Sequence, residues 1–380
     1  MNGLLRWAVV TVVGVHAAIH LLGAAKGLGW ASVPQLKHPI GVATGGAWFV
    51  AAVAVALAAA LLAAGTTWWW AIAALAAVAS QAVIMTSWQD AKAGTAVNVL
   101  LLVAAVLGYA AHGPHSFDAQ WQERADSALQ ASATSQDLVR ETDLAALPGP
   151  LAGYLRGAGV VGKPRPQSAY VTFHGRIRSG TDQPWMPFTG RQVNTFGDSP
   201  TRTFLMHATR SGLPVTVLHV LDDGHATMRG KVLSLVTVLD AAGPEMDQGE
   251  TVTVFNDMVV LAPGALLDAP VLWTTVSDRE VRGTFSSDGQ VVSATLHFNA
   301  AHELVDFVSD DRLAASADGH AFTARTWSTP IATYRQFGTY RLPARGEARW
   351  HKPAPEGEFA YIELTFDGIS YDPPTSAHPP

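Results

Sequence analysis

His16 and His20 are the residues of this sequence whose types and spacing first suggest chemistry. Because they are four residues apart, they lie on one face of a helix. Together with Asp90, two imidazoles and a carboxylate could bind a divalent metal, and the imidazoles could also ligate haem, line a quinone pocket or relay protons. The pair lacks the Glu and the third ligand of helical zinc motifs, so we assign no metal site. His16, His20 and Asp90 remain the candidate cofactor-binding residues.

A structural interpretation of these residues is the one we favour. Neutral histidines inside a helical bundle can hydrogen-bond to Ser, Asn or backbone groups of neighbouring helices and hold the bundle together. Asp90 can pair with Lys92 or Lys37. Both interpretations stay open at the level of the sequence.

A second pair of acidic residues, Asp247 and Glu250, has the spacing of a helix capping box. The pattern predicts that Asp247 caps a helix over 251–261, so we interpret the pair as capping residues and not as catalytic carboxylates. His219 and His225 flank a predicted turn, could face each other across a hairpin, and are interpreted as surface or edge histidines. The sequence contains no GxSxG, phosphate-binding glycine loop or HExxH. Catalytic residues are therefore undefined, and the sequence favours a protein that is not an enzyme.

Large apolar side chains in the second half of the chain could line a pocket for an apolar ligand. The alternative is that they are ordinary core residues. The candidate ligand-binding residues are Trp185, Met186, Phe188, Phe255, Met258 and Trp273, with Phe196 and Phe204 as further lining candidates.

The charges of the 380-residue chain are divided unevenly between its two parts. Residues 1–112 contain four basic side chains and one acidic side chain, so residues 113–380 carry 21 basic and 30 acidic side chains, a net charge of −9. Such a surface repels polyanions, which argues against nucleic acid as a partner. The chain has no cysteine, which excludes disulfides, thiolate metal sites and a cysteine nucleophile.

Residues 1–112 are predicted to be a four-helix transmembrane domain. Four apolar segments are near the length that a spanning helix requires, at 4–25, 45–64, 68–86 and 96–111. The positive-inside rule places Lys26, Lys37 and Lys92 in the cytoplasm. We therefore expect a multi-pass protein of the bacterial cytoplasmic membrane whose C-terminal domain is extracytoplasmic.

The rest of the chain changes in character twice. Residues 113–147 are polar and predict a linker or exposed tether helix, residues 148–372 predict a β-rich domain, and residues 373–380 predict a disordered tail. Within the β-rich domain, apolar residues alternate with polar ones in short runs. These runs are 169–178, 201–209, 214–221, 227–239, 271–276, 280–285, 291–298, 304–309, 331–341, 347–350 and 359–369.

The predicted fold class is therefore an α + β protein in two parts. A four-helix transmembrane bundle is followed by an antiparallel β half-barrel, in which the helix at 251–261 carries a wide apolar stripe and forms a lid on the concave side.

Three spaced motifs resemble an uncharacterised family of bacterial domains of unknown function. They are Leu147-Pro148-Gly149-Pro150, Pro184-Trp185-Met186-Pro187-Phe188 and Gly243-Pro244-Glu245-Met246-Asp247-Gln248-Gly249-Glu250, and the resemblance covers about residues 146–371. The helical part is loosely similar to four-helix DoxX-like proteins. The strand order resembles the lipoprotein-carrier half-barrels, whose helical lid shelters acyl chains. The resemblance implies this architecture and supplies no catalytic residues.

These observations lead to one main functional expectation and two alternatives. We expect a membrane-anchored module of the bacterial envelope that binds membrane lipid or another hydrophobic ligand, in order to transfer or sense it. The first alternative is a membrane redox enzyme, or a metal-, haem- or quinone-binding protein, with its site at His16, His20 and Asp90. The second alternative is a structural protein whose β domain docks another envelope protein.

Overall fold

The computed structural model describes residues 3–132, 135, 137–316, 318–355 and 357–373. The chain divides into two compact units, Met1–Ala119 with Leu233–Leu235, and Gln120–Val232 with Val236–Pro380. Apart from Pro373, the predicted disordered tail at 373–380 lies outside the described residues.

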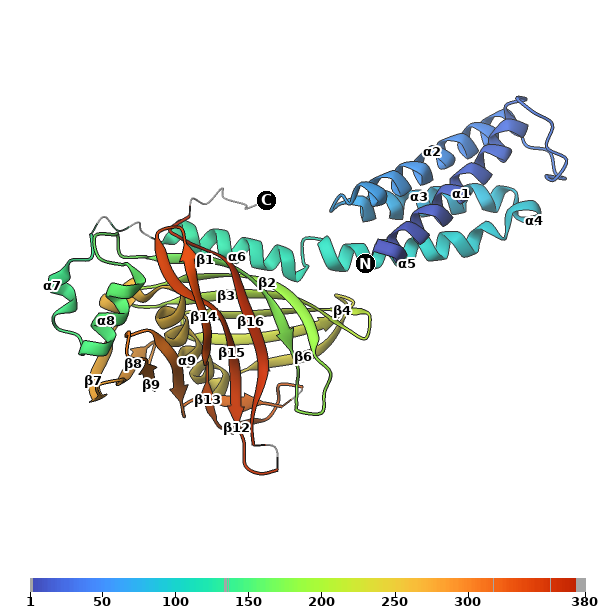
Figure 1. The fold of residues 1–380 in the computed structure, drawn as a ribbon. Helices are drawn as coiled ribbons and strands as arrows, with labels where there is room; N and C mark the ends of the chain where they lie inside the picture. Colours follow the sequence, from blue (N-terminus) through green and yellow to red (C-terminus); the bar gives the residue numbers. More distant parts are fainter. Residues whose placement is uncertain (1–2, 133–134, 136, 317, 356, 374–380) are drawn as a thin grey trace. The chain divides into compact units, whose positions relative to one another are not determined.

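The first unit is helical (Figure 1). Its helices are α1 Gly3–Gly27, α2 Val42–Ala64, α3 Trp69–Thr86, the short α4 Trp88–Ala91 and α5 Gly94–His112. Within the described residues, four helices are long and apolar enough to cross a membrane. A helix satisfies its own backbone hydrogen bonds, which is what a segment surrounded by lipid requires. The four predicted apolar segments are confirmed as helices, with ends that differ by at most three residues.

Small residues allow α1 and α2 to pack closely. A Cβ atom added at Gly23 would lie 2.4 Å from the ring of Trp48, and one added at Gly27 would lie 2.5 Å from the Cα atom of Gly45. Only glycine avoids these clashes. The Gly and Ala content of the bundle therefore sets its helix spacing, as small residues commonly do between helices in lipid.

The segment predicted as an exposed tether contains packed structure. Helix α6 spans Phe117–Ala131, and its Trp121 is buried, with the indole N–H donating to the carbonyl oxygen of Thr203 at 3.0 Å. Further along, Val139 and Leu144 belong to the core of the β domain. The domain therefore extends N-terminal to residue 148, because apolar residues within the polar segment are buried against the sheet.

The second unit contains a large curved sheet. Two helices, α7 Glu141–Leu144 and α8 Gly149–Ala158, precede it. Its first strands are β1 Ser168–Ile177, β2 Met186–Thr195, β3 Thr201–Arg210, β4 Leu213–Asp222, β5 His225–Val232 and β6 Val236–Ala242. The remaining strands are β7 Val271–Ser277, β8 Glu280–Ser287, β9 Gln290–Phe298, β10 Leu304–Ser309, β11 Leu313–Ala315, β12 Phe322–Ala324, β13 Thr326–Ser328, β14 Ile331–Phe337, β15 Tyr340–His351 and β16 Glu358–Tyr371.

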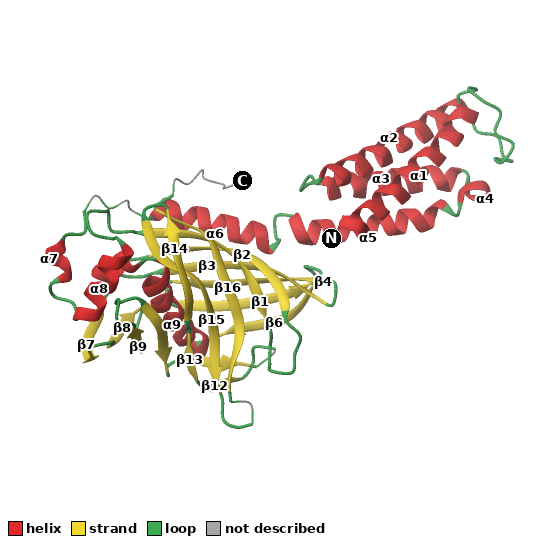
Figure 2. Cartoon of the chain, viewed as in Figure 1, coloured by secondary structure: helices red, strands yellow, loops and turns green. Residues whose placement is uncertain are grey.

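The strand order follows the chain order around an open curve (Figure 2). The order is β6-β5-β4-β3-β2-β1-β16-β15-β13-β10-β9-β8-β7, with antiparallel pairing between neighbours such as β1 and β16. The two edge strands, β6 and β7, are consecutive in sequence and are joined through α9 Pro244–Leu261 and a short 3-10 helix, Pro263–Leu267. The predicted antiparallel half-barrel is confirmed. A curved sheet with this many strands surrounds more space than its own side chains fill.

Two predicted strands are each divided by a turn. The run 227–239 becomes β5 and β6 because Leu233 and Ser234 adopt positive φ angles of 54° and 59°. The run 331–341 is interrupted at Gly338, where φ is 58°, so that β14 and β15 form a hairpin. Strand β2 was missed because its residues 189–192 are polar or glycine, although it pairs with both β1 and β3.

The start of α9 differs from the predicted capping box. The helix begins at Pro244, preceded by Gly243 with a φ of 105°, because proline is favoured in the first turn of a helix. The carboxylate of Asp247 instead accepts the backbone N–H of Ala226 at 2.6 Å. The prediction that Asp247 and Glu250 cap this helix is therefore wrong.

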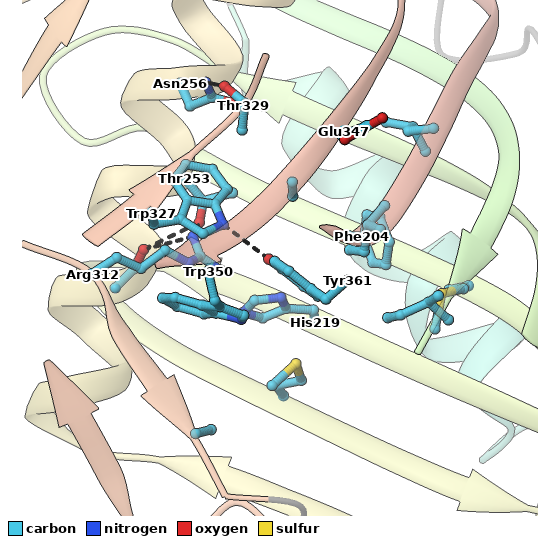
Figure 3. A pocket seen from close by; sticks show the side chains of 18 of the residues that line it. Phe204, His219, Thr253, Asn256, Arg312, Trp327, Thr329, Glu347, Trp350 and Tyr361 are labelled. Atoms are coloured by element: carbon cyan, nitrogen blue, oxygen red, sulfur yellow. Dashed lines mark hydrogen bonds between the residues drawn. The ribbon is translucent and has the colours of Figure 1, made fainter. Parts of the chain in front are cut away.

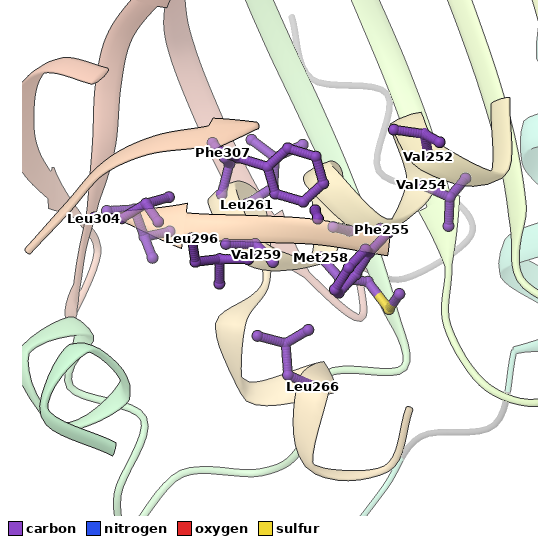
Figure 4. Close-up of a cluster of buried hydrophobic side chains, with 14 of the residues drawn as sticks. Val252, Val254, Phe255, Met258, Val259, Leu261, Leu266, Leu296, Leu304 and Phe307 are labelled. Carbon is purple, nitrogen blue, oxygen red and sulfur yellow. The ribbon is translucent and has the colours of Figure 1, made fainter. Parts of the chain in front are cut away.

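Helix α9 lies on the concave side of the sheet, as expected, but it is more deeply buried than a lid with one apolar stripe. Every residue from Gly249 to Leu261 is buried. Its Phe255 stacks on Phe285 and contacts Phe307 edge-on, with ring centroids 5.4 Å apart in both pairs. Figure 4 shows this cluster around α9. The helix is thus an internal wall of the domain.

Candidate ligand-binding cavity

A cavity of about 460 Å³ lies between α9 and the concave face of the sheet. Because side chains alternate between the two faces of a strand, one phase of β3, β4 and β5 points inward. The inward residues Met206, Val217 and Met228 line the cavity. Its walls are mainly apolar.

Aromatic side chains form the wall made by β13, β15 and β16. Trp327 and Trp350 line the cavity together with Tyr361. The indole N–H of Trp327 donates to the hydroxyl of Tyr361 at 3.0 Å, and the rings of Trp350 and Tyr361 are stacked at 5.5 Å. Figure 3 shows these side chains around the cavity. The indole N–H of Trp327 and the hydroxyl of Tyr361 are thus paired with each other, which leaves ring surface for an apolar ligand.

A buried ion-pair network holds α9 against the sheet. Arg202 is 6 % exposed and Glu250 is 0 % exposed. The three guanidinium nitrogens of Arg202 donate to Glu250 Oε1 at 2.7 Å, to Asp257 Oδ2 at 2.8 Å and to Gln192 Oε1 at 2.8 Å. Although burial opposes ionisation, the charges of His219, Arg202 and Arg312 hold the pKa of Glu250 well below its usual range. Glu250 is therefore a charged structural group.

His219 is part of this network and is not a surface histidine. Its side chain lines the cavity and is buried, with Nε2 3.0 Å from Glu250 Oε2. Burial lowers the pKa of His219. In the ladder, His219 pairs with Met228, whereas His225 pairs with Asp222. The predicted surface position of His219 is wrong, because β4 turns this residue toward the inside, and the two histidines do not face each other.

Arg312 lies at the edge of the same network. Its Nη1 donates to the carbonyl oxygen of Gly249 at 3.1 Å and to Thr253 Oγ1. Its guanidinium carbon is 4.4 Å from the centre of the Trp327 ring. Within the described part of the chain, Arg312 forms no ion pair with a carboxylate.

The structure places the six predicted ligand-binding residues in three different environments. Met186 and Phe188 line the cavity. Phe255, Met258 and Trp273 belong to, or pack against, the hydrophobic core. Trp185 lies beside two arginines instead, with the guanidinium carbon of Arg178 4.5 Å from its ring centre. Of the two further candidates, Phe204 lines the cavity, and Phe196 packs against the core.

Arg202 and Arg312 were not singled out from the sequence, whereas Glu250 and His219 were noted but given other roles. A usable signal exists for Arg202, because it has the same strand phase as the inward-facing Phe204 and Met206. A charged residue in an apolar phase indicates a buried charge that needs a partner. Arg312 offers no such signal, since it precedes a short strand with no clear period.

In the helical unit, the structure brings His16 and His20 together with polar residues of α3 and α5. His16 Nε2 lies 3.0 Å from Asn98 Oδ1, and His20 Nε2 lies 2.8 Å from Ser80 Oγ. His20 Nδ1 donates to the carbonyl oxygen of His16 at 2.9 Å. These contacts match the structural interpretation, in which the histidines link neighbouring helices.

Asp90 has different partners from the two histidines. Its Oδ2 accepts the backbone N–H of His38 at 3.0 Å and lies 3.2 Å from His38 Nδ1. The partner is thus His38, where Lys92 or Lys37 was expected. No group of three His, Asp or Glu side chains in the described ranges could hold a metal ion.

A family model matches residues 137–364. The chain therefore belongs to the family DUF6544, whose function is unknown. The match confirms the resemblance to a family of unknown function, and it shows that the DUF6544 domain begins about ten residues before the predicted start at 146. A search of curated proteins finds no significant match. The similarity of the helical part to DoxX-like proteins stays a prediction.

Several solved structures are similar to the chain at 10–11 % sequence identity. A DUF1329 family protein from Desulfovibrio piger covers 59 % of this chain and 92 % of its own, with a TM-score of 0.34 and 11 % identity. An outer membrane lipoprotein-sorting protein domain from Vibrio parahaemolyticus covers 68 % and 95 %, with a TM-score of 0.32 and 11 % identity. A LolA superfamily protein from Nitrosomonas europaea covers 61 % and 94 %, with a TM-score of 0.30 and 10 % identity. Similarity at this level does not identify a function for the DUF6544 domain.

Proposed function

We propose that the β domain binds a lipid or another hydrophobic small molecule, and that the four helices anchor it in the bacterial cytoplasmic membrane. The observation that carries the proposal is the cavity of about 460 Å³ between α9 and the sheet. Ligand sites in proteins commonly have volumes of about 300–1,000 Å³ and mainly apolar walls.

The apolar walls favour such a ligand over water. Water in a cavity needs two to four polar partners, and an apolar cavity without them stays dry. On the β3–β6 side, the inward side chains of Met206, Val217, Met228 and Leu239 supply no strong hydrogen-bonding group. The inward polar residues of the same wall, Arg202 and His219, are paired with Glu250. An acyl chain or similar apolar group gains free energy by leaving water for this space.

The membrane part of the proposal rests on the four apolar helices. An even number of crossings would return the chain to the side of its N-terminus. The basic residues Lys37 and Lys92 lie in the two loops on the other side, and Lys26 lies in the last turn of α1 at the same end. The positive-inside rule then places the β domain outside the cytoplasm, where it could transfer or sense a lipid.

Lipid extraction followed by mass spectrometry tests the binding function. The full chain is purified as the native sequence, as Val217→Trp, which fills the cavity, and as Val291→Trp, a matched control whose position is 65 % exposed. We expect one lipid class to be enriched in the native and Val291→Trp proteins and depleted at least about fivefold in Val217→Trp. Identical lipid content in all three would contradict the proposal.

A further inference from the structure

Three arginines line the cavity, namely Arg178, Arg202 and Arg312. The two that bond to α9, Arg202 and Arg312, differ in how their hydrogen-bond donors are used. Each of the three nitrogens of Arg202 has a partner in Glu250, Asp257 or Gln192. Both carboxylates of the network are thereby bound to Arg202. Neither carboxylate forms an ion pair with Arg312. The hydrogen-bond partners of Arg312 are a carbonyl oxygen and a hydroxyl group.

Arg312 is held in place on one side only. Nη1 donates to Gly249 and Thr253, which fixes the guanidinium against α9. The face of the guanidinium lies over Trp327 at 4.4 Å, which is a favourable cation–π geometry. Nε is buried without a hydrogen-bond partner, and Nη2 has no partner among the described residues.

The two free nitrogens of Arg312 are adjacent on the guanidinium. The N–H groups of Nε and Nη2 point in parallel and form the fork that binds a carboxylate or a phosphate through two hydrogen bonds. A buried N–H group without a hydrogen-bond partner carries a desolvation cost. An oxyanion bound at this place would remove that cost by accepting the hydrogen bond. The remaining walls of the cavity are mainly apolar and suit a hydrocarbon tail.

We propose that the ligand of the cavity is an amphipathic acid whose oxyanionic head group binds the Nε–Nη2 fork of Arg312. Its apolar tail lies against the inward side chains of β3, β4 and β5, among them Val217 and Met228. This inference rests on the proposed binding function and adds the chemical class of the ligand. The head group is a carboxylate, as in a fatty acid, or a phosphate, as in a lipid phosphate.

The test compares three probes that share one tail. Palmitate, hexadecyl phosphate and hexadecanol carry a carboxylate, a phosphate and a hydroxyl group. Binding of each probe to the full chain is measured in nanodiscs of phosphatidylcholine, with empty nanodiscs subtracted. Arg312→Gln removes the fork and the charge. Arg325→Gln is the control, because Arg325 lies in the same segment but outside the cavity lining.

We expect at least one acidic probe to bind about tenfold more tightly than hexadecanol, because charge-assisted bidentate pairs are strong. Arg312→Gln should abolish this preference and leave hexadecanol binding unchanged, and Arg325→Gln should change neither. A preference for palmitate identifies the carboxylate, and one for hexadecyl phosphate the phosphate.

Three equal affinities in the native protein, or a preference that survives Arg312→Gln, would overturn the inference and leave the binding function standing. Failure of all three probes to bind would overturn the binding function as well. If Arg312→Gln misfolds and no longer binds hexadecanol, the test uses two other measurements. These are the preference of the native protein for an acidic probe over hexadecanol, and the same preference in Arg312→Lys. That variant keeps the charge without the fork and should lose most of the preference.

Discussion

The carboxylate of Glu250 keeps its charge inside the β domain because cations surround it. Replacing one member of a buried ion pair leaves the other members without compensation. Glu250→Gln should therefore lower the free energy of unfolding by about 3 kcal/mol. Thermal unfolding of the full chain, followed by tryptophan fluorescence, measures this effect.

The control for Glu250 is Glu280→Gln. Glu280 pairs with His297 at 3.3 Å on the surface, where its side chain is 40 % exposed, and such pairs contribute about 0–1 kcal/mol. Equal shifts in melting temperature for the two variants would contradict the structural role of the buried network.

Asp306 is a second, partly buried carboxyl group, and its effect on the stability of the fold depends on pH. Burial raises its pKa from 3.8 to about 6, so folding favours the protonated form. The resulting stabilisation is complete below about pH 4 and is lost as the pH rises through about 6. Asp306→Asn stays neutral at every pH. Because the side chain is partly exposed, we expect the variant to be more stable than the native chain by only about 1–2 kcal/mol at pH 8, and equal to it at pH 4.

Melting temperatures of the native and Asp306→Asn chains at the two pH values test this. A stability difference that is the same at pH 4 and pH 8 would show that the carboxyl group is not desolvated as described.

At the scale of elements, the bundle depends on how closely α1 approaches α2. Gly23→Leu places a side chain where the ring of Trp48 already lies 2.4 Å from a Cβ position, whereas Gly14 on the same helix has open space around it. We expect Gly23→Leu to lower the yield of folded protein severalfold or to reduce its melting temperature, because overpacking costs about 1–3 kcal/mol. Gly14→Leu should behave like the native chain. Equal behaviour of the two variants, in a size-exclusion and melting assay, would argue against this contact.

Helices and strands could be predicted where the pattern of apolar residues within the segment itself specifies the element. Four apolar stretches specified four helices, and alternation located most strands. The missed features depend on distant partners. Asp247 has the spacing of a cap, yet it bonds to Ala226 on β5. Strand β2 is polar along part of its length and is defined by β1 and β3 on either side.

The candidate site was predictable only in part for the same reason. The sequence indicated an apolar cavity next to a helix, and Met186, Phe188 and Phe204 line it. The ion pairs of Arg202 join residues 48 and 55 positions apart, so no local pattern could reveal them. His16 and His20 were recognisable as a pair, but their partners Ser80 and Asn98 come from other helices.

For the whole molecule, orientation in the membrane is the first question. The chain has no cysteine, so a single introduced cysteine reports its own side. In spheroplasts, a membrane-impermeant maleimide should label Thr181→Cys in the β domain directly. It should label Ser32→Cys, in the loop between α1 and α2, only after lysis. The reverse pattern would place the β domain in the cytoplasm.

The central claim is that the cavity between α9 and the sheet holds a hydrophobic ligand. Photo-crosslinking of a diazirine-bearing fatty acid to the full chain in nanodiscs tests it most directly, with the crosslinked residues located by mass spectrometry. The account predicts crosslinks at inward positions such as Met206, Val217 and Met228, competed by unlabelled palmitate and lost in Val217→Trp. Crosslinks confined to the four apolar helices, or unchanged in Val217→Trp, would contradict it.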